Sequence, residues 1–526
     1  MSVSESTSVA QKATLSADQR QAAAALLRAN TPPTVVELGE LFAAAGHELA
    51  LVGGPVRDVF LNGQPKDLDL TTDAVPERVL EITRKWADKT WTVGIEFGTI
   101  GLRKRDEIFE ITTYRSEAYD RASRKPEVKY GTSLVADLKR RDFTINAMAA
   151  RLPSFELVDP FGGLAALRDE VIRTPGRPED SFSDDPLRIL RAARFAARFG
   201  FTVADDVQAA MKAMAPRLSI VSAERITDEL TKLMLTPAPE VGLDLLVRTG
   251  VADVVLPELP ALRMEADEHH RHKDVYTHSL TVLRQAIDAE PRYGLGPDLV
   301  LRLAAILHDI GKPRTRSLLP GGKVAFHHHE VVGAKLARKR LTELRFPKDV
   351  ISDVSELVKL HLRFHGYGDG EWTDSAVRRY VRDAGPLLTR LNALTRADCT
   401  TRNARKAARL AATYDALEAR IEVLREEEEL DKIRPELDGE EIMRILGLTQ
   451  GPLVGKAWNH LLELRLAEGM VGRERATQEL LRWASAEGLR PAADASAADG
   501  SAEDGSAEDG SADDPSPDDR PPADSQ

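Results

Sequence analysis

The chain has 526 residues, 42% of them hydrophobic, which at roughly 100 to 200 residues per domain predicts three or four domains. No apolar run reaches the roughly 18 residues that span a bilayer, and the N-terminal stretch lacks the charged start and apolar core of a signal peptide. A single cysteine, Cys399, excludes an intramolecular disulfide framework and a cysteine-rich zinc site. We therefore expect a cytoplasmic protein without a membrane partner, whose metal ligands, if any, are Asp, Glu and His.

The formal net charge of −12 is concentrated at the C-terminus. Residues 491–526 hold eleven acidic residues and one arginine, which leaves the rest of the chain near neutrality. This segment repeats a five-residue unit rich in Asp, Ser, Ala and Gly, so we expect residues 490–526 to be disordered, like residues 1–15. The alternative is that the tail is an acidic decoy that competes with RNA for basic surface.

Composition changes along the part of the chain that we expect to be ordered. Residues 16–165 mix helical stretches with short β-rich runs that end at Gly, Asp or charged turns. From residue 166 onward helical periodicity takes over. The expected fold is multidomain α+β: a head with a mixed sheet and helices, followed by an all-helical body. We divide that body into residues 166–256, 257–420 and 421–489.

A glycine turn opens the segment LVGGPVRDVFLNGQPKDLDLTTD. Gly53 and Gly54 lack the Cβ atoms that would keep a phosphate away from the backbone, and the next helix offers N–H groups at its N-terminus. Arg57 adds a forked cation in the following turn. The pattern is typical of a binding site for a phosphorylated ligand.

Two carboxylates follow this turn. Asp67 and Asp69 lie two residues apart in a predicted strand, so both side chains project from the same face, and Glu110 on a later strand supplies a third acid. Adjacent acids repel each other unless cations lie between them, and hard oxygen ligands suit Mg²⁺. Two such ions could activate an attacking hydroxyl and stabilise a departing pyrophosphate. The alternative interpretation is a surface turn with solvated acids.

The segment DDPLRILRAARFAAR carries a basic helix face. Arg188, Arg191, Arg194 and Arg198 recur at three- and four-residue steps, which places them on one side of a helix. Asp185 lies one turn earlier and puts an acceptor beside a fork of donors, an arrangement that can meet the Watson–Crick edge of a nucleobase. An amphipathic helix with merely solvated arginines would show the same spacing.

These motifs, in this order, resemble a known family. The segments GGPVRDVFLNGQPKDLDLTTD, FEITTYRSEAYDRASRKPEVKYG, DLKRRDFTINAMA, LVDPFGGLAALRDEVIRT and DDPLRILRAARFAARFGF are similar to those of class II tRNA nucleotidyltransferases and bacterial poly(A) polymerases, within the polymerase-β-like nucleotidyltransferase superfamily. The resemblance covers about residues 35–240. It implies a nucleotidyltransferase head over residues 16–165 and a nucleotide- and RNA-binding neck over residues 166–256.

The resemblance also implies roles for individual residues. Asp67, Asp69 and Glu110 become the catalytic carboxylates, of which the two aspartates hold Mg²⁺. The positions matching the nucleotide contacts of the family are Gly54, Arg57, Arg141, Asp185, Arg188, Arg191 and Arg194. Of these, Asp185 and Arg188 act as an amino-acid template for C or A, and Arg141 is expected to touch the triphosphate or ribose.

Four histidines and two aspartates are spread over predicted helices further along the chain. They are His278, His308, Asp309, His329, His361 and Asp398. Side chains from neighbouring helices can converge on one or two metal ions, and this donor set favours Mn²⁺, Ni²⁺, Co²⁺ or Fe²⁺ over Mg²⁺ alone. With GKP directly after His308 and Asp309, the spacing resembles the HD phosphohydrolase domain, to which we assign residues 257–420. A second, hydrolytic activity on phosphoester ends is then implied; the alternative is a helical module that only supports RNA binding.

The leading hypothesis from the sequence is template-independent addition of CMP and AMP from CTP and ATP to the 3′ ends of tRNA. A poly(A) polymerase shares these motifs, but the sequence FGTIGLRKRDEIFEITTYR stands where many such enzymes carry an arginine-rich GRRF-type element. The other alternative is an HD hydrolase with a non-catalytic RNA-binding head, against which the intact carboxylates count. The sequence leaves the oligomeric state open.

Overall fold

The computed structural model describes residues 16–61, 63–65, 67–116, 129–264, 274–320, 323–364, 372–401, 403–428 and 433–489. The two termini that the sequence analysis expects to be disordered, residues 1–15 and 490–526, lie outside the described residues. The chain divides into two compact units, one within residues 1–366 and 386–414 and the other within residues 367–385 and 415–526. None of the helices described is both long and apolar enough to cross a membrane.

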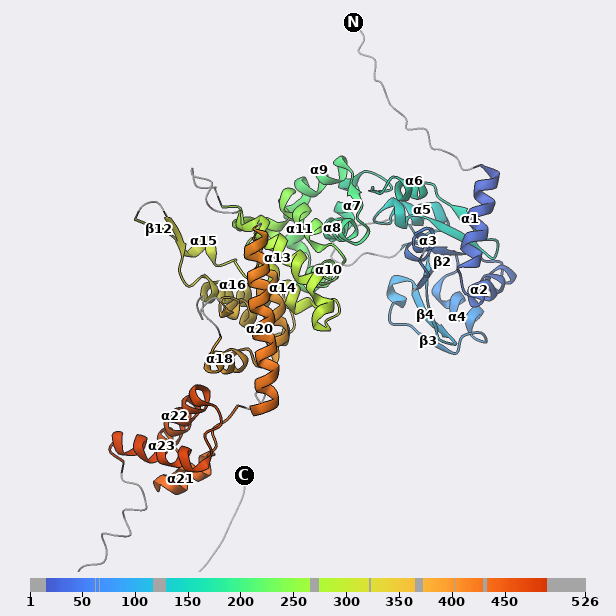
Figure 1. The fold of residues 1–526 in the computed structure, drawn as a ribbon. Coiled ribbons are helices and arrows are strands. Elements are labelled where there is room, and N and C mark those ends of the chain that lie inside the picture. The colour runs from blue at the N-terminus through green and yellow to red at the C-terminus, as the bar shows by residue number, and fades with distance from the viewer. Residues whose placement is uncertain are drawn as a thin grey trace, which may run out of the picture. The chain divides into compact units, whose positions relative to one another are not determined.

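A seven-stranded mixed sheet forms the N-terminal part of the first unit (Figure 1). Its strands, in the order β3-β4-β5-β2-β1-β8-β9, are β3 (Lys89–Trp91), β4 (Thr99–Lys104), β5 (Glu107–Thr113), β2 (Leu68–Thr72), β1 (Leu49–Val52), β8 (Ala149–Leu152) and β9 (Glu156–Val158). The central strand β1 reads LALV and is buried at every position, as expected of a strand covered on both faces. β2 and β5 pair in parallel, whereas the other neighbouring strands are antiparallel.

Helices surround this sheet and continue beyond it. Those of the head are α1 (Ala17–Ala29), α2 (Pro33–Ala44), α3 (Gly54–Phe60), α4 (Pro76–Thr83), α5 (Leu134–Lys139) and α6 (Gly163–Arg168). The next group contains α7 (Pro178–Asp184), α8 (Arg188–Phe199), α9 (Asp205–Met214), α10 (Ala223–Met234), α11 (Pro239–Arg248) and α12 (Ala252–Val255). Within α8, Ile189, Leu190 and Phe195 are buried, and the helix packs on α10 and α11.

The remaining helices of the first unit carry the histidine-rich region. They are α13 (Val275–Ala289), α14 (Leu299–Leu307), α15 (Lys312–Thr315), α16 (His329–Glu343), α17 (Lys348–Leu360) and α19 (Leu388–Ala397). The expected α+β architecture is therefore confirmed, with one correction: the body is not purely helical. Short strands pair there as β10 (Val171–Ile172) with β11 (Thr202–Val203), and as the hairpin β12 (Arg316–Leu319) and β13 (Lys323–Phe326).

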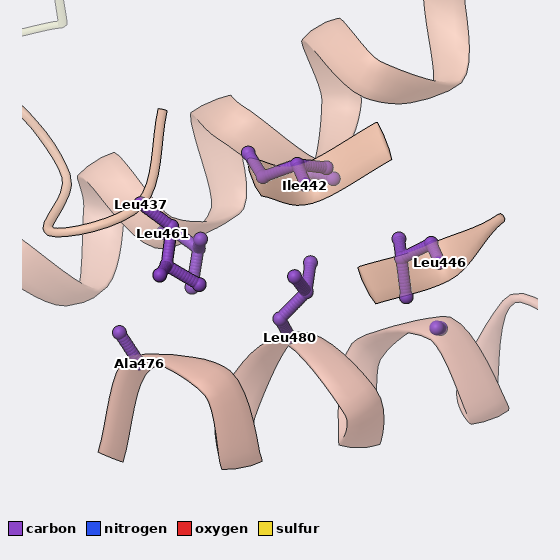
Figure 2. Close-up of a cluster of buried hydrophobic side chains, with 8 residues drawn as sticks. Leu437, Ile442, Leu446, Leu461, Ala476 and Leu480 are labelled. Atoms are coloured by element: carbon purple, nitrogen blue, oxygen red, sulfur yellow. The ribbon is translucent and has the colours of Figure 1, made fainter. Parts of the chain in front are cut away.

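The second unit is a small helical bundle with its own core. Its helices are α18 (Asp374–Ala384), α21 (Gly439–Leu446), α22 (Pro452–Glu468) and α23 (Arg473–Ala486), and it also includes the latter part of α20 (Ala404–Glu428). The side chains of Leu437, Ile442, Leu461 and Leu480 meet in its centre (Figure 2). Residues 367–385, which the sequence analysis places in the 257–420 segment, group with this bundle; the predicted domain boundaries otherwise stay predictions.

A buried ion pair joins the histidine-rich helices to α10. The Arg302 side chain, 3% exposed, binds both carboxylate oxygens of Glu290 at 2.7 Å and also donates to the carbonyl oxygens of Met234 and Thr236. These four hydrogen bonds are buried. Together they compensate the cost of removing the Arg302 and Glu290 charges from water.

We predict that Glu290→Ala destabilises the first unit by about 3 to 5 kcal/mol, because it leaves the Arg302 guanidinium buried without its counter-charge. The matched control is Asp228→Ala, which breaks an exposed pair with Lys232. Denaturant titration should show a lower midpoint for Glu290→Ala and little change for Asp228→Ala. Equal midpoints for the two variants would contradict the prediction.

Candidate active site and metal centre

The glycine turn between β1 and α3 is shaped for close approach. Gly53 has a φ of +73°, a conformation that L-residues rarely adopt, and donates its N–H to the Met148 carbonyl at 3.1 Å. A Cβ atom at Gly53 would lie 2.9 Å from Nη1 of Arg141. At Gly46, which also has a positive φ, nothing lies within 4 Å of such an atom. The backbone conformation therefore favours glycine at position 53, and any Cβ atom there would displace the end of the Arg141 side chain.

Three carboxylates gather beside this turn. Asp69 on β2 is the direct register partner of Glu110 on the parallel strand β5, so the two side chains are neighbours on one face of the sheet. Burial raises the pKa of Asp69, the charges of Glu110 and Asp67 raise it further, and the Arg141 guanidinium acts in the opposite direction. The strand begins at Leu68, so Asp67 lies at the bend just before β2 and not within it, a correction to the sequence analysis. Mutual repulsion of this kind is what a bound cation relieves.

Arg57 lies behind the turn and is buried. Its guanidinium donates to Asp58 and to the side-chain oxygen of Asn146, and it lies 4.9 Å from the ring centroid of Phe199. The forked cation expected from the sequence is thus present, but its nitrogen atoms already have protein partners. Arg141 is more accessible, and its contact with the buried Asp137 carboxylate is longer, at 3.4 Å.

Asp185 and Arg188 flank the start of α8, but their side chains do not contact each other among the described residues. One oxygen of Asp185 accepts the Leu187 N–H at 3.2 Å, and the other accepts Nη2 of Arg225 at 2.9 Å. Arg188 donates to the Ser181 hydroxyl at 2.9 Å and to the Arg140 carbonyl at 2.6 Å. The expected acceptor, Asp185, and the expected donor fork, Arg188, are thus close in sequence. Different neighbouring residues orient their side chains.

Two buried acids hold the next arginines of α8. Arg191 donates twice to one oxygen of Asp142, at 2.6 and 2.9 Å, and Arg194 donates to Glu229 on α10 at 2.6 Å. Burial alone would lower the pKa of Arg191, but Asp142 and Glu229 outweigh it and raise that pKa. Sequence reasoning missed Glu229. The sequence places Glu229 on the buried side of a predicted helix, and this position indicates a paired acid, because a buried carboxylate needs a partner.

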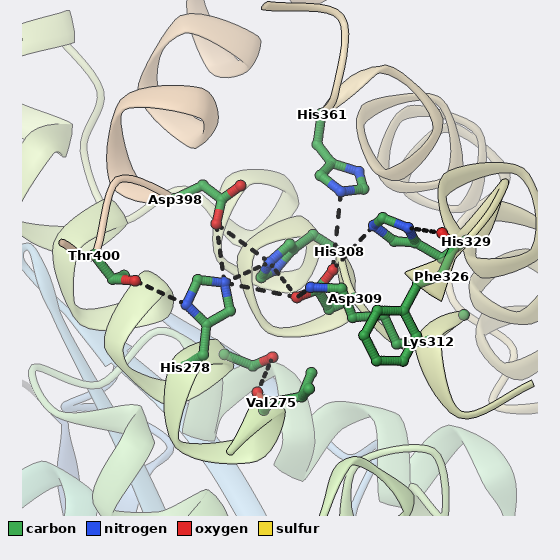
Figure 3. Close-up of polar contacts among 12 residues, drawn as sticks. Val275, His278, His308, Asp309, Lys312, Phe326, His329, His361, Asp398 and Thr400 are labelled. Carbon is green, nitrogen blue, oxygen red and sulfur yellow. Dashed lines mark hydrogen bonds and ion pairs between the residues drawn. The ribbon is translucent and has the colours of Figure 1, made fainter. Parts of the chain in front are cut away.

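The six predicted ligands of the histidine-rich region converge in the structure (Figure 3). They form two groups, His278, His308 and Asp398 in one and Asp309, His329 and His361 in the other, with the ligand atoms of each group within 4.8 Å of one another. Asp309 lies between the groups: its Oδ2 is 3.2 Å from Nε2 of His308 and its Oδ1 is 3.3 Å from Nε2 of His329.

Each imidazole is oriented through its second nitrogen. Nδ1 of His308, His329 and His361 lies 2.6 to 2.9 Å from a backbone carbonyl three residues earlier, and Nδ1 of His278 lies 3.0 Å from the Thr400 hydroxyl. Because a carbonyl only accepts, Nδ1 of these three residues carries the proton and Nε2 points into the site. His308 and His361 directly follow α14 and α17, so the same bonds satisfy carbonyls in the last turns of these helices.

The donor chemistry of this centre fits a metal ion. Nε2 of His329 and of His361 is buried without a hydrogen-bond partner. Burial, followed by the charge of His308, lowers the pKa of His361 to about 4, so its imidazole is neutral and able to coordinate at neutral pH. Burial opposes protonation of His308, but Asp309 and Asp398 raise its pKa to about 9. A cation would take the place of that proton between the carboxylates.

Comparisons with known proteins give a consistent result. Three family models match: the poly A polymerase head domain over residues 49–173, a probable RNA and SrmB-binding site of polymerase A over residues 200–262, and the HD domain over residues 275–403. The A-adding tRNA nucleotidyltransferase of Deinococcus radiodurans is 36% identical, over 67% of this chain and 80% of its own length. The CCA-adding enzyme of Bacillus subtilis is 34% identical, over 60% and 75%. The CC-adding tRNA nucleotidyltransferase of Thermus thermophilus is 32% identical, over 82% and 93%.

Solved structures share the fold. The Bacillus stearothermophilus CCA-adding enzyme in complex with CTP superposes with a TM-score of 0.63 at 24% identity, covering 87% of this chain and 99% of that chain. The Thermotoga maritima CCA-adding enzyme complexed with tRNA superposes with a TM-score of 0.57 at 19% identity, covering 88% and 98%.

We predict that metal-stripped protein regains about two transition-metal ions per chain at the histidine-rich centre, one for each three-ligand group. His361→Ala should bind one ion fewer, because it removes a ligand from the second group only. The control is His328→Ala, whose imidazole is exposed and belongs to neither group. Elemental analysis after dialysis against Mn²⁺ measures the stoichiometry, and the same metal content in all three proteins would contradict this assignment.

Proposed function

Because the chain belongs to the tRNA nucleotidyltransferase family, we propose that it adds CMP and AMP to the 3′ ends of tRNA, using CTP and ATP and no nucleic-acid template. The partners of the proposed reaction are tRNA and the two nucleotides. Curated relatives carry three names, for enzymes that add A, CC or CCA, so the product has to be established directly. We also propose that the protein acts in the cytoplasm, where an enzyme of this kind meets tRNA.

The observation that carries the proposal is the cluster of Asp67, Asp69 and Glu110 beside the glycine turn. The register of β2 and β5 fixes two of these acids side by side, and burial makes the charge of Asp69 costly without a cation. Mg²⁺ held by Asp67 and Asp69 would supply charge neutralisation at the α-phosphate and lower the pKa of the attacking RNA hydroxyl. The open backbone at Gly53 leaves room for the phosphates, and Arg141 is the neighbouring cation.

Base selection follows from the residues at the start of α8. The exocyclic amines of C and A donate hydrogen bonds, and the Asp185 carboxylate accepts them. The Arg188 guanidinium donates to the adjacent ring nitrogen of either base. Arg191 and Arg194 add positive charge next to this pair, and Asp142 and Glu229 hold them in place. Protein side chains thus take the part of a template in this proposal.

The product assay uses tRNA that ends before CCA, after CC, or after the complete CCA, with CTP and ATP supplied singly and together. A CCA-adding enzyme extends the first substrate to CCA, adds A to the second and leaves the third unchanged. A CC-adding enzyme would not extend the CC end, and an A-adding enzyme would extend only that end. Continued growth with ATP would identify a poly(A) polymerase and overturn the proposal.

We predict that Asp67→Ala and Asp69→Ala each reduce nucleotide addition by several orders of magnitude, because each removes a ligand of the ion that neutralises the phosphates. The control is Asp106→Ala, which removes an exposed acid from the turn between β4 and β5 of the same sheet. Gel analysis of extended tRNA gives the rates, and circular dichroism checks the fold. Substantial addition by the Asp67→Ala/Asp69→Ala double variant would refute the assignment.

A second candidate function is metal-dependent hydrolysis of phosphoester ends at the HD centre. Two buried Nε2 atoms without a hydrogen bond, those of His329 and His361, lie 3.3 and 4.0 Å from the ionised Asp309 carboxylate and favour hydrolysis over a purely supporting helical module, which needs no such atoms. Bound Mn²⁺, Ni²⁺, Co²⁺ or Fe²⁺ would provide a hydroxide and polarise the phosphoryl oxygen. Lys312, which lies 2.6 Å from Asp309, adds a positive charge for an anionic substrate.

We predict that His308→Ala/Asp309→Ala abolishes hydrolysis of 2′,3′-cyclic phosphates and phosphomonoesters yet retains nucleotide addition, since the two centres share no residue. Assays on metal-stripped protein, with each ion added back in turn, measure the hydrolysis. Retained tRNA extension by the same preparation serves as the control for folding. Absence of hydrolysis by the wild-type protein with every ion would leave the domain as a support for RNA binding.

A further inference from the structure

Arg225 is the partner that the structure gives to the Asp185 carboxylate. The arginine lies in the first turn of α10, and its Nη2 donates to Oδ2 of Asp185 at 2.9 Å. Oδ1 of the same carboxylate accepts the Leu187 N–H, so both oxygens have a defined position. Arg188, by contrast, directs both terminal nitrogens to Ser181 and Arg140. The direction of the Asp185 side chain therefore depends on a residue from a different helix.

We propose that Arg225 is a positioning residue, which holds the Asp185 carboxylate for reading of the nucleobase and so sets the discrimination of C and A against U and G. This inference rests on the proposed function. Each carboxylate oxygen has two lone pairs, so an oxygen that accepts from Arg225 or Leu187 can still accept from an exocyclic amine. U and G present a carbonyl oxygen at that place, and a fixed carboxylate repels it.

The exposure of the Arg225–Asp185 ion pair distinguishes a role in positioning the carboxylate from a role in stabilising the fold. The Arg225 side chain is 53% exposed and that of Asp185 is 29% exposed. Ion pairs at such accessible positions contribute little to folding, because water and salt screen them. Holding the carboxylate in one rotamer before the nucleotide arrives, however, removes an ordering cost from the binding step. Loss of Arg225 should therefore affect selection of the base more than the fold.

The variants for the test are Arg225→Ala, Arg225→Lys and a matched control, Arg217→Ala. Arg217 is also exposed, but it donates to the hydroxyl and carbonyl of Ser183 in α7 and not to Asp185. We expect Arg225→Ala to lower the ratio of kcat/KM for CTP over UTP, and for ATP over GTP, by about tenfold. Arg225→Lys should restore part of the ratio, since an ammonium keeps the charge but loses the planar fork. Arg217→Ala should leave the ratio unchanged.

A double-mutant cycle with Asp185→Ala tests whether Arg225 acts through that carboxylate. We expect the Asp185→Ala protein to lack discrimination, so adding Arg225→Ala to it should change the ratio no further. An equal additional loss would show that Arg225 acts independently of Asp185 and would overturn the inference. Unchanged or improved selectivity of the single Arg225→Ala variant would overturn it as well.

Measurements of nucleotide binding without RNA test this inference independently of the proposed function. Equilibrium dialysis with CTP and UTP reports base preference whether or not nucleotide is transferred to tRNA. A wild-type protein that prefers CTP but extends no tRNA would contradict the proposed function alone, and the Arg225 variants would still be compared by binding. A wild-type protein that binds CTP and UTP equally would contradict both.

Discussion

The basic face of α8 depends on acids that the fold places behind it. Arginines at three- and four-residue steps repel one another, and burial makes their charge more costly still. Asp142 and Glu229 compensate Arg191 and Arg194 with bonds of 2.6 to 2.9 Å. Asp142 directly follows Arg141, the cation beside Gly53, so the same segment of chain links the glycine turn to α8. This network orients Arg191 and Arg194 beside Asp185 and Arg188, the candidate base-selecting residues.

The two candidate metal sites differ in how the fold positions their ligands. In the head, a strand register brings oxygen ligands together, and their repulsion creates the demand for a hard cation. In the HD centre, carbonyls at helix ends fix each imidazole through Nδ1, and the neutral Nε2 of His361 and the ionised carboxylates give a mixed nitrogen and oxygen set. The two candidate sites therefore favour different ions, because their ligands differ in softness and in how they are oriented.

The sequence predicted those features that local patterns determine. Strand and helix periodicity was sufficient for the α+β architecture, and the proximity of Glu110 to Asp69 followed from placing both on strands of one sheet. The Asp185 and Arg188 pair was predicted from helical spacing, but Asp185 precedes α8 with a φ of −144° and a ψ of 103°, so that spacing does not bring the side chains together. Arg225 and Glu229 lie on α10. The buried position of Glu229 in the predicted helix indicates that it needs a partner, but only the packing of α10 on α8 shows that the partners are Asp185 and Arg194. The burial of Arg57 likewise depends on Phe199 and Asn146, which are distant in the chain.

The order of the ligands along the chain has a consequence for biosynthesis. Asp67, Asp69 and Glu110 all precede the middle of the first unit, so the carboxylate cluster can assemble while the rest of the protein is still being translated. The HD centre draws its first ligand from α13 and its last, Asp398, from the end of α19. Until the ribosome has released α19, the four histidines and Asp309 have been synthesised, but the group of His278, His308 and Asp398 still lacks its carboxylate. The three-ligand group that contains Asp398 can therefore be completed only late in translation, after the residues of the head have been synthesised.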